Sequence, residues 1–300
     1  MSETATPPAA GQDPGANIEI DDILAMPAGR RIDALVAFGR AFLARPQRDA
    51  DTAESLVHGL VDLIRACAGD SRQRLEMGIV LGHLGDPRLR VPEDPAYWAD
   101  MDAPGHRFKV GRFPVTSGEV QAWVDAGGYR DDAAWSPAGR AWRDAADRLW
   151  PDLAKADDVA DLVVPNQPVV GVTWYEAEAY ATAKAARLLT LDERRFVVRG
   201  PEKRPYPWGE PFGAGNANTR EEVLGRPCAV GLFYSDRTPE GVWDLAGNVA
   251  EWCADGSEQS RVIHPGSWQQ PSMASWAKAL EMIAPETRSA DLGFRLAKDA

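Results

Sequence analysis

The chain has 300 residues, 44% of them hydrophobic and 26% charged, which allows one large domain or two ordinary ones and excludes a disordered or collagen-like protein. The formal net charge of -12 argues against nucleic acid or an anionic membrane as the main partner, because both repel an acidic surface. No apolar run approaches the roughly 18 residues that span a bilayer, and the N-terminus lacks the basic-then-apolar order of a signal peptide. We therefore expect a cytoplasmic protein that binds neither nucleic acid nor membrane directly.

Residues 1–18 are predicted to form a disordered tail, because they hold almost no large apolar side chain that burial could use to offset ordering entropy. Residues 19–90 show helical spacing in three apolar stripes, the first interrupted at Gly39. The third stripe begins after Asp70 and Ser71 as capping residues and stops at Gly85. The phrase LGHLGDPR (81–88) resembles the end of a HEAT-type helical repeat, so we expect a small all-α segment with a structural or partner-facing role. The stripes are Ile32, Leu35, Val36, Phe42 and Leu43; Leu56, Leu60, Leu63 and Ile64; and Leu75, Ile79, Val80 and Leu84.

Residues 91–300 differ from the helical segment in composition and in the length of their predicted elements. All 11 tryptophans lie between Trp98 and Trp276, and frequent Gly and Pro predict short segments joined by turns. Two helices are still predicted, at 117–126 and, after Thr173, at 174–186. The sequence therefore indicates an irregular, loop-rich domain in which tryptophans supply most of the buried area.

Three cysteines, Cys67, Cys228 and Cys253, are too few and too widely spaced for a disulfide framework or a CxxC metal site. We expect them to be buried or half-buried free thiols in a reducing compartment.

A series of phrases in the second half resembles the formylglycine-generating enzyme, or sulfatase-modifying factor, family. They occur in the family's order and cover some 200 residues, as a rough count over 113–297. The resemblance implies a fold related to C-type lectins, with a small central antiparallel sheet, two flanking helices and long irregular loops. The fold class is thus α+β, with the all-α segment preceding the lectin-like domain. The phrases are FPVTSGEVQAWVDAGGY (113–129), PVVGVTWYEAEAYA (168–181), RLLTLDERRFVVRG (187–200), YPWGE (206–210), NANT (216–219), GVWDLAGNVAEW (241–252), PGSW (265–268) and LGFRLA (292–297).

Enzymes of this family are understood to oxidise a substrate cysteine with copper held by two cysteines, a soft sulfur pair that suits Cu(I). Counting from Ser267, the resemblance puts those positions at Gln270 and Ser275, which supply an amide and a hydroxyl. We therefore expect a degenerate member without copper. The family's iron-dependent sulfoxide synthases use an HxxxHxE set, and the four histidines of this chain do not have that spacing.

The resemblance also implies structural calcium. The first site would use Asp244, Gly247, Val249 and Glu251, and a second would use Asn218, the Thr219 carbonyl, Glu222 and Leu224. Side-chain and backbone oxygens are the ligands that this hard cation prefers. The alternative is that Asp244 and Glu251 only hydrogen-bond loop amides. A nearby departure from the family is Arg194-Arg195, which replaces the Trp-Glu of the common phrase PTEAEWEY.

The first functional hypothesis is a non-catalytic recognition or sensor protein with a protein partner and an unknown small ligand. Its ligand-binding surface would combine apolar and adaptable polar side chains. Proteins diversified by retroelements use the same fold and the same segment. Those systems mainly change adenines within AAC codons, which cannot produce the Trp, Met, Gln, Lys and Glu found in this segment. This counts against a retroelement-diversified surface. The predicted surface residues are Trp268, Gln269, Gln270, Met273, Ser275, Trp276, Lys278 and Glu281.

Two alternatives remain open. An enzyme of unassigned reaction could draw on Glu119, Asp125, His106 and the Arg194-Arg195 pair, provided that folding brings them together. A purely structural subunit would instead dock a neighbouring protein through its helical segment.

Overall fold

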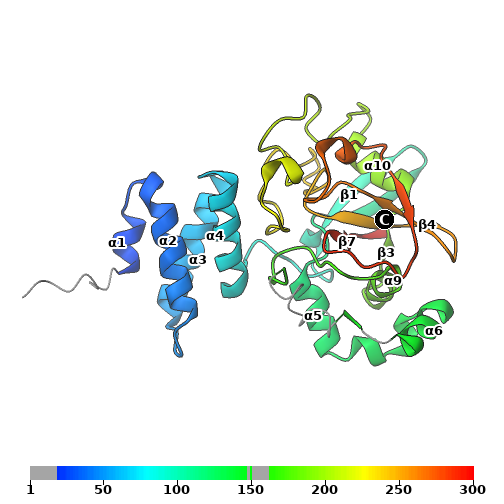
Figure 1. Cartoon of the computed structure of the whole chain (residues 1–300), viewed down its shortest axis with the longest axis horizontal. Coiled ribbons are helices and arrows are strands. Elements are labelled where there is room, and N and C mark those ends of the chain that lie inside the picture. The colour runs from blue at the N-terminus through cyan, green and yellow to red at the C-terminus, as the bar shows by residue number, and fades with distance from the viewer. Residues whose placement is uncertain (1–18, 147–148, 151–161) are drawn as a thin grey trace, which may run out of the picture.

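The computed structural model describes residues 19–146, 149–150 and 162–300 (Figure 1). The predicted tail of residues 1–18 lies outside the described residues. The chain forms a small helical unit followed by a larger α+β domain, so the predicted fold class is confirmed. Among the described residues, no helix has both the length and the apolar character needed to cross a membrane.

The helical unit contains α1 (Ile20–Leu24), α2 (Ala28–Leu43), α3 (Ala50–Arg65) and α4 (Ser71–Leu84). The three predicted stripes coincide with α2, α3 and α4, which confirms these helices. Asp70 caps α4 as expected: its carboxylate accepts from Gln73 N at 2.8 Å, and the Gln73 side chain accepts from Asp70 N. Gly39 does not interrupt α2. A side chain at Gly39 would collide with Val80 of α4, so the glycine allows the two helices to approach closely.

The core of the helical unit continues into the larger domain. Residues of α2, α3 and α4 pack in one apolar cluster with the loop residues Leu224, Cys228, Ala229, Leu232 and Phe233. Polar contacts join the same parts, because Ser71 Oγ donates to Glu222 at 2.7 Å and Asn166 Nδ2 donates to the Gly78 carbonyl at 3.0 Å. The helical unit is therefore packed against the 222–233 loop and is not a separate body. Its resemblance to a HEAT repeat stays a prediction.

Two four-stranded sheets form the frame of the larger domain. The first has the order β1-β2-β8-β3 and is antiparallel throughout, whereas the second has the order β6-β5-β4-β7 and pairs β4 with β7 in parallel. The expectation of one small antiparallel sheet was therefore wrong, since the C-terminal strands divide between two sheets. The strands are β1 (Trp98–Ala103), β2 (His106–Gly111), β3 (Arg187–Leu188), β4 (Ala250–Gly256), β5 (Arg261–His264), β6 (Glu281–Ile283), β7 (Leu292–Phe294) and β8 (Leu296–Asp299).

Helices surround these sheets (Figure 1). The two predicted ones are present and begin at capping boxes, with Thr116 before α5 and Thr173 before α9. A third capping box, Thr190 with Glu193, starts α10 within the phrase that carries the arginine pair. The helices are α5 (Ser117–Asp125), α6 (Pro137–Ala145), α9 (Trp174–Ala183) and α10 (Leu191–Arg199), with short 3-10 turns η1 (Pro95–Tyr97), η2 (Gly128–Arg130), η3 (Asp132–Ala134), η4 (Arg220–Glu222) and η5 (Ser272–Ser275).

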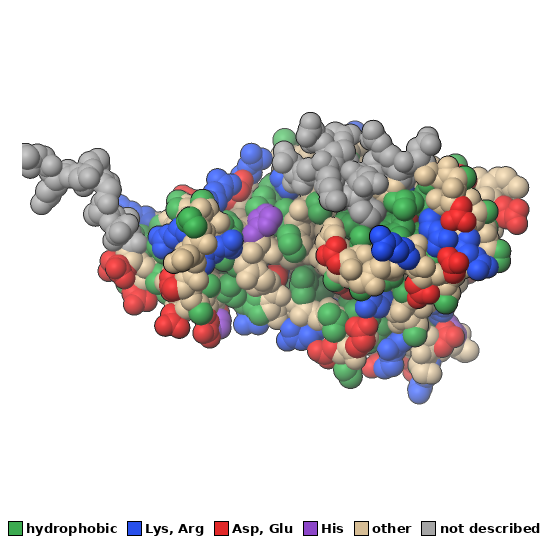
Figure 2. Space-filling view, turned by 90° about the horizontal axis from the view of Figure 1, so that it is seen from below, with side chains coloured by type: hydrophobic (Ala, Val, Ile, Leu, Met, Phe, Trp, Pro, Cys, Tyr) green, Lys and Arg blue, Asp and Glu red, His purple; other side chains and the backbone are tan. Residues whose placement is uncertain are grey.

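The main core of the domain is built from aromatic side chains, as the sequence predicted. It includes Trp98, Trp123, Trp135, Trp174 and Trp252, and several indole N–H groups donate to backbone carbonyls, such as Trp252 Nε1 to Val172 at 3.0 Å. These bonds satisfy the only polar atom of each buried ring. The surface around this core is mixed in charge, and acidic side chains gather at the outer end of the helical unit (Figure 2).

The prediction that all three cysteines are buried or half-buried was wrong for Cys67. Cys228 and Cys253 are buried free thiols, whereas Cys67 is exposed. It lies in the turn after α3 with a φ of 51°, and its amide donates to the Ile64 carbonyl. The thiol of a residue in such a surface turn points away from the core.

Candidate functional site

Residues 268–282, which we call the recognition segment, follow β5 and include η5 and the start of β6. The segment is fixed near its beginning because Trp268 N donates to the Asn248 carbonyl at 3.1 Å and Trp268 Nε1 donates to the Ala290 carbonyl at 3.2 Å. Further along, Ala277 N donates to the Pro205 carbonyl at 2.9 Å. The segment is therefore held on the domain without regular secondary structure over most of its length.

The middle of the recognition segment presents large apolar side chains to solvent. Met273, Trp276, Leu280 and Met282 are 77%, 46%, 44% and 56% exposed. Only three other large hydrophobic residues are as open in the described ranges: Val91, Val223 and Tyr234. Exposed apolar side chains gathered on one segment are typical of an interaction site, whereas scattered ones are not.

The eight predicted surface residues differ in accessibility. Gln269, Met273, Trp276, Lys278 and Glu281 are exposed, while Trp268 and Gln270 are half-buried. Ser275 is 1% exposed, so its side chain cannot contribute to a surface. Ser275 is the last residue of η5 and packs against the backbone at Gly266, and this contact buries it.

Gln270 and Ser275, where the resemblance implies the family's copper cysteines, contain no sulfur. The buried Ser275 Oγ has no hydrogen-bond partner in the described part of the chain, and Gln270 is tied into the loop by its backbone, which donates to Ser267 and accepts from Arg220. The two buried thiols lie elsewhere, Cys253 on β4 and Cys228 in the core shared with the helical unit. Burial raises the pKa of Cys253 to about 12 and that of Cys228 well above its usual value. Burial therefore favours the protonated form of both thiols.

The first predicted calcium site is occupied by arginines. Glu251 Oε2 accepts from Arg194 Nε at 2.7 Å, and Oε1 accepts from Arg295 at 2.8 Å. Two guanidinium groups at one carboxylate repel a divalent cation, so these residues do not fit calcium well. Gly247 and Val249 contribute backbone to the same turn, where Gly247 N donates to Asp236. Calcium binding at this site stays a prediction, and the contacts of the two arginines with Glu251 argue against it.

Asp236, which the sequence did not single out, is a buried carboxylate close to Asp244, whose N donates to the Asp236 carbonyl at 3.0 Å. Asp236 accepts from the amides of Leu245, Ala246 and Gly247, and Asp244 accepts from Gly231 N at 2.7 Å. Burial raises the pKa of Asp236 to about 7, with the nearby Asp244 charge adding to the rise. Burial likewise raises the pKa of Asp244 to about 6.

The second predicted calcium site is also used for internal contacts. Asn218 Nδ2 donates to the Arg226 carbonyl, and Thr219 Oγ1 donates to Glu221. Glu222 accepts from Ser71 Oγ and from Gly215 N. Asn218 Oδ1 is buried without a partner among the described residues, and Leu224 belongs to the core shared with the helical unit. Across the described ranges, no three His, Cys, Asp or Glu side chains converge on a point where a metal could sit.

The residues proposed for catalysis do not come together. His106 contacts Glu193 at 2.8 Å, and Asp125 accepts from Gln121 within α5. Glu119 caps α5, and burial raises its pKa to about 7. Arg194 is committed to Glu251. Each candidate group has its own local partner, which gives the enzyme hypothesis no assembled acid-base pair.

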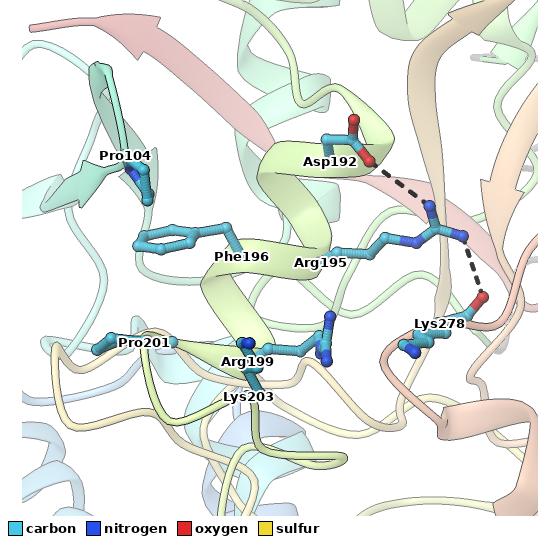
Figure 3. Close-up of a pocket in the computed structure, with 9 residues that line it drawn as sticks. Pro104, Asp192, Arg195, Phe196, Arg199, Pro201, Lys203 and Lys278 are labelled. Carbon is cyan, nitrogen blue, oxygen red and sulfur yellow. Dashed lines mark hydrogen bonds and ion pairs between the residues drawn. The ribbon is translucent and has the colours of Figure 1, made fainter.

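A pocket of about 610 Å³ lies between α10, the turn that follows it, the β1-β2 hairpin and the recognition segment (Figure 3). Sequence analysis named only Arg195 and Lys278 of its residues. The signal for Arg199 was its spacing four residues after Arg195, which places both cations on one side of α10. The lining residues are Pro104, Asp192, Arg195, Phe196, Arg199, Gly200, Pro201, Lys203 and Lys278.

Comparison with known proteins agrees with this architecture. Residues 85–300 match the family described as "Sulfatase-modifying factor enzyme 1-like domain". A hercynine oxygenase from Mycolicibacterium thermoresistibile is 31% identical, over 71% of this chain and 55% of the relative. An inactive C-alpha-formylglycine-generating enzyme 2 from Mus musculus is 26% identical, over 73% and 88%, and a formylglycine-generating enzyme from Streptomyces coelicolor is 28% identical, over 68% and 83%.

The chain spans only a little over half the length of the hercynine oxygenases that it matches. The match to the family domain covers most of the chain and includes both sheets, α5, α9, α10 and the recognition segment. The chain therefore belongs to the sulfatase-modifying factor enzyme 1-like family.

Proposed function

We propose that this chain is a non-catalytic recognition protein of its family and that it binds a protein partner through the recognition segment. The observation that carries the proposal is the exposure of Met273, Trp276, Leu280 and Met282 on one anchored segment. Large apolar and aromatic side chains at the centre of an interface supply most of its binding energy. The fixed position of Trp268 reduces the ordering entropy that binding would cost.

The lack of a catalytic role is supported by the chemistry of the same segment. Gln270 and Ser275 provide no thiolate, and the pKa of Cys253 is raised to about 12 by burial. A relative of this chain is named as an inactive formylglycine-generating enzyme, so a fold of this kind exists without that activity. Other relatives are named as enzymes, and the hercynine oxygenases extend well beyond the matched part. An oxidase or oxygenase function is the alternative.

We also propose that the protein works in the cytoplasm. All three cysteines are free, and a reducing compartment keeps thiols in that state.

Site-specific photocrosslinking in the native cell tests the recognition proposal. A benzophenone amino acid at Met282 lies at the edge of the apolar surface and leaves Trp276 in place, and the same probe at Tyr234 is the control, because that position is similarly exposed at 53%. We expect a discrete crosslinked protein from position 282 only, lost when Trp276→Ser is added. Equal crosslinking from both positions, or a product unaffected by Trp276→Ser, contradicts the proposal.

The non-catalytic part needs its own assay. Purified protein incubated with copper, oxygen and a cysteine-containing sulfatase peptide should leave the peptide unchanged by mass spectrometry. Conversion of the cysteine to an aldehyde would show that thiols of this chain do bind copper productively.

A further inference from the structure

Four of the nine residues that line the pocket beside α10 are basic, although the chain as a whole carries a net charge of -12. The lining also includes one carboxylate, Asp192. Arg195 NH1 lies 3.5 Å from Asp192 Oδ1. Among the described residues, no carboxylate lies within ion-pair distance of the other three cations, Arg199, Lys203 and Lys278. Like charges held close together without counter-ions repel one another, and a bound anion relieves that repulsion.

Arg195 is held in place to receive such an anion. Its NH2 group donates to the Lys278 carbonyl at 3.2 Å, which fixes the side chain between α10 and the recognition segment (Figure 3). Its Nε–H is buried and has no acceptor in the described part of the chain. The terminal nitrogens contact Asp192 and the Lys278 carbonyl and keep further N–H groups that an oxyanion in the pocket could accept from.

The other side of the pocket is apolar. Figure 3 shows the Phe196 ring pointing toward Pro104 of the β1-β2 hairpin, away from Arg195, and Pro201 on the same side of α10 as Phe196. An inorganic anion would leave this wall exposed to water. A ligand with a flat apolar body would cover it, and its charged group would still reach the cations.

We propose that this pocket binds a small organic phosphate monoester with a flat apolar body. Four cations less one carboxylate leave three positive charges, which a dianionic phosphate balances better than a carboxylate does. The phosphate lies against Arg195 and Arg199, with Lys203 and Lys278 at the rim, and the apolar body packs on Phe196. Lys278 belongs to both the pocket and the recognition segment, whereas Arg199 and Lys203 lie outside that segment, so changes at Arg199 and Lys203 test the pocket without altering the surface proposed for the partner.

Calorimetric titration of the full chain with phenyl phosphate tests this inference, with inorganic phosphate and phenol as separate titrants. We expect phenyl phosphate to bind more tightly than either, because only it uses both walls, and to weaken as salt is added. The double variant Arg199→Gln/Lys203→Gln should weaken binding by at least about tenfold, the scale of one charge-assisted hydrogen bond. Arg48→Gln/Arg65→Gln is the matched control, since it removes two exposed positive charges from the helical unit.

Several outcomes would overturn the inference: no heat from millimolar phenyl phosphate, inorganic phosphate binding as tightly as phenyl phosphate, or the two double variants weakening binding equally. Both pairs of residues are at least partly solvent-accessible, so an unchanged thermal unfolding midpoint in each variant separates loss of binding from loss of folding. The crosslink from position 282 should persist in Arg199→Gln/Lys203→Gln, which keeps failure of this inference distinguishable from failure of the recognition proposal.

Discussion

Arg194 of α10 and Glu251 of β4 form an ion pair closed to solvent: Nε lies 2.7 Å from Oε2, and the side chains are 1% and 2% exposed. Arg194 also donates to the Leu245 carbonyl at 2.7 Å, and Arg295 of the LGFR phrase binds the second oxygen of Glu251. These contacts hold Glu251 charged, because the two arginines lower its pKa against the opposing effect of burial, which is the largest single influence. The network links α10, β4 and the C-terminal strands.

Removing one partner of this network should be costly. Arg194→Ala leaves a buried carboxylate with a single cation, and we expect a loss of about 3–5 kcal/mol in the free energy of unfolding. The neighbouring change Arg195→Ala, at a partly exposed side chain, should cost about 1 kcal/mol or less. Urea unfolding measures both, and equal losses would show that Arg194 does not stabilise the core as described.

The buried aspartate pair should make stability depend on pH. The pKa of Asp244 is raised from 3.8 to about 6, so the folded state holds a proton that the unfolded state has already released. Its contribution therefore favours folding at low pH and is lost as pH rises from about 4 to about 7, by on the order of 2–3 kcal/mol. Asp244→Asn removes this dependence and keeps an oxygen for Gly231 N.

The difference in unfolding free energy between Asp244→Asn and the unmodified chain reports this effect together with the part of the rise in the Asp236 pKa that is lost once the Asp244 charge is gone, and both act in the same direction. Buried His264, whose pKa burial lowers to about 3, has the opposite influence, but it is present in both proteins and cancels. We expect the variant to gain relative stability steadily over that pH range. A difference that stays constant with pH would contradict the raised pKa.

Calcium should have no effect at Glu251. Because two guanidinium groups already neutralise this carboxylate, we expect the thermal midpoint in millimolar calcium to equal that in chelator. A higher midpoint in calcium that Asp244→Asn abolishes would restore the prediction made from the sequence.

Close packing between α4 and the 222–233 loop can be tested at a glycine. A Cβ at Gly78 would lie 2.8 Å from Ala229 Cβ and 3.1 Å from Leu232 Cδ1, so Gly78→Ala should destabilise by about 1–3 kcal/mol. Gly29→Ala in α2 is the control, because nothing lies within 4 Å of that position. It should be neutral or stabilising by up to about 1 kcal/mol. Similar losses in both would mean that α4 is not packed as tightly as described.

Local signals made the helices predictable. Asp70 and Thr173 lie next to the helices that they cap, so the start of each helix is encoded within four residues. The lectin-like domain was predictable because the family phrases occur in the family's order along the chain, even where single residues differ.

Contacts between distant residues were not predictable in the same way. In the sequence the Arg194-Arg195 pair is only a departure from the family phrase, but Arg194 is buried because Glu251, 57 residues later, folds against it. Asp236 gave no signal because its partners are backbone amides, which every residue but proline carries. The cationic pocket required α10, the hairpin and the recognition segment to meet, and no local pattern states that they do.

The apolar contact between the helical unit and the larger domain limits where the chain can be shortened for experiments. The family match begins at residue 85, just after α4 ends, yet Leu232 and Phe233 are covered by α4 and its neighbours. Separating the chain at that boundary would expose apolar side chains on both fragments. Residues 85–300 alone would expose the apolar side chains that α4 covers in the full chain, and an exposed apolar patch of this kind favours aggregation.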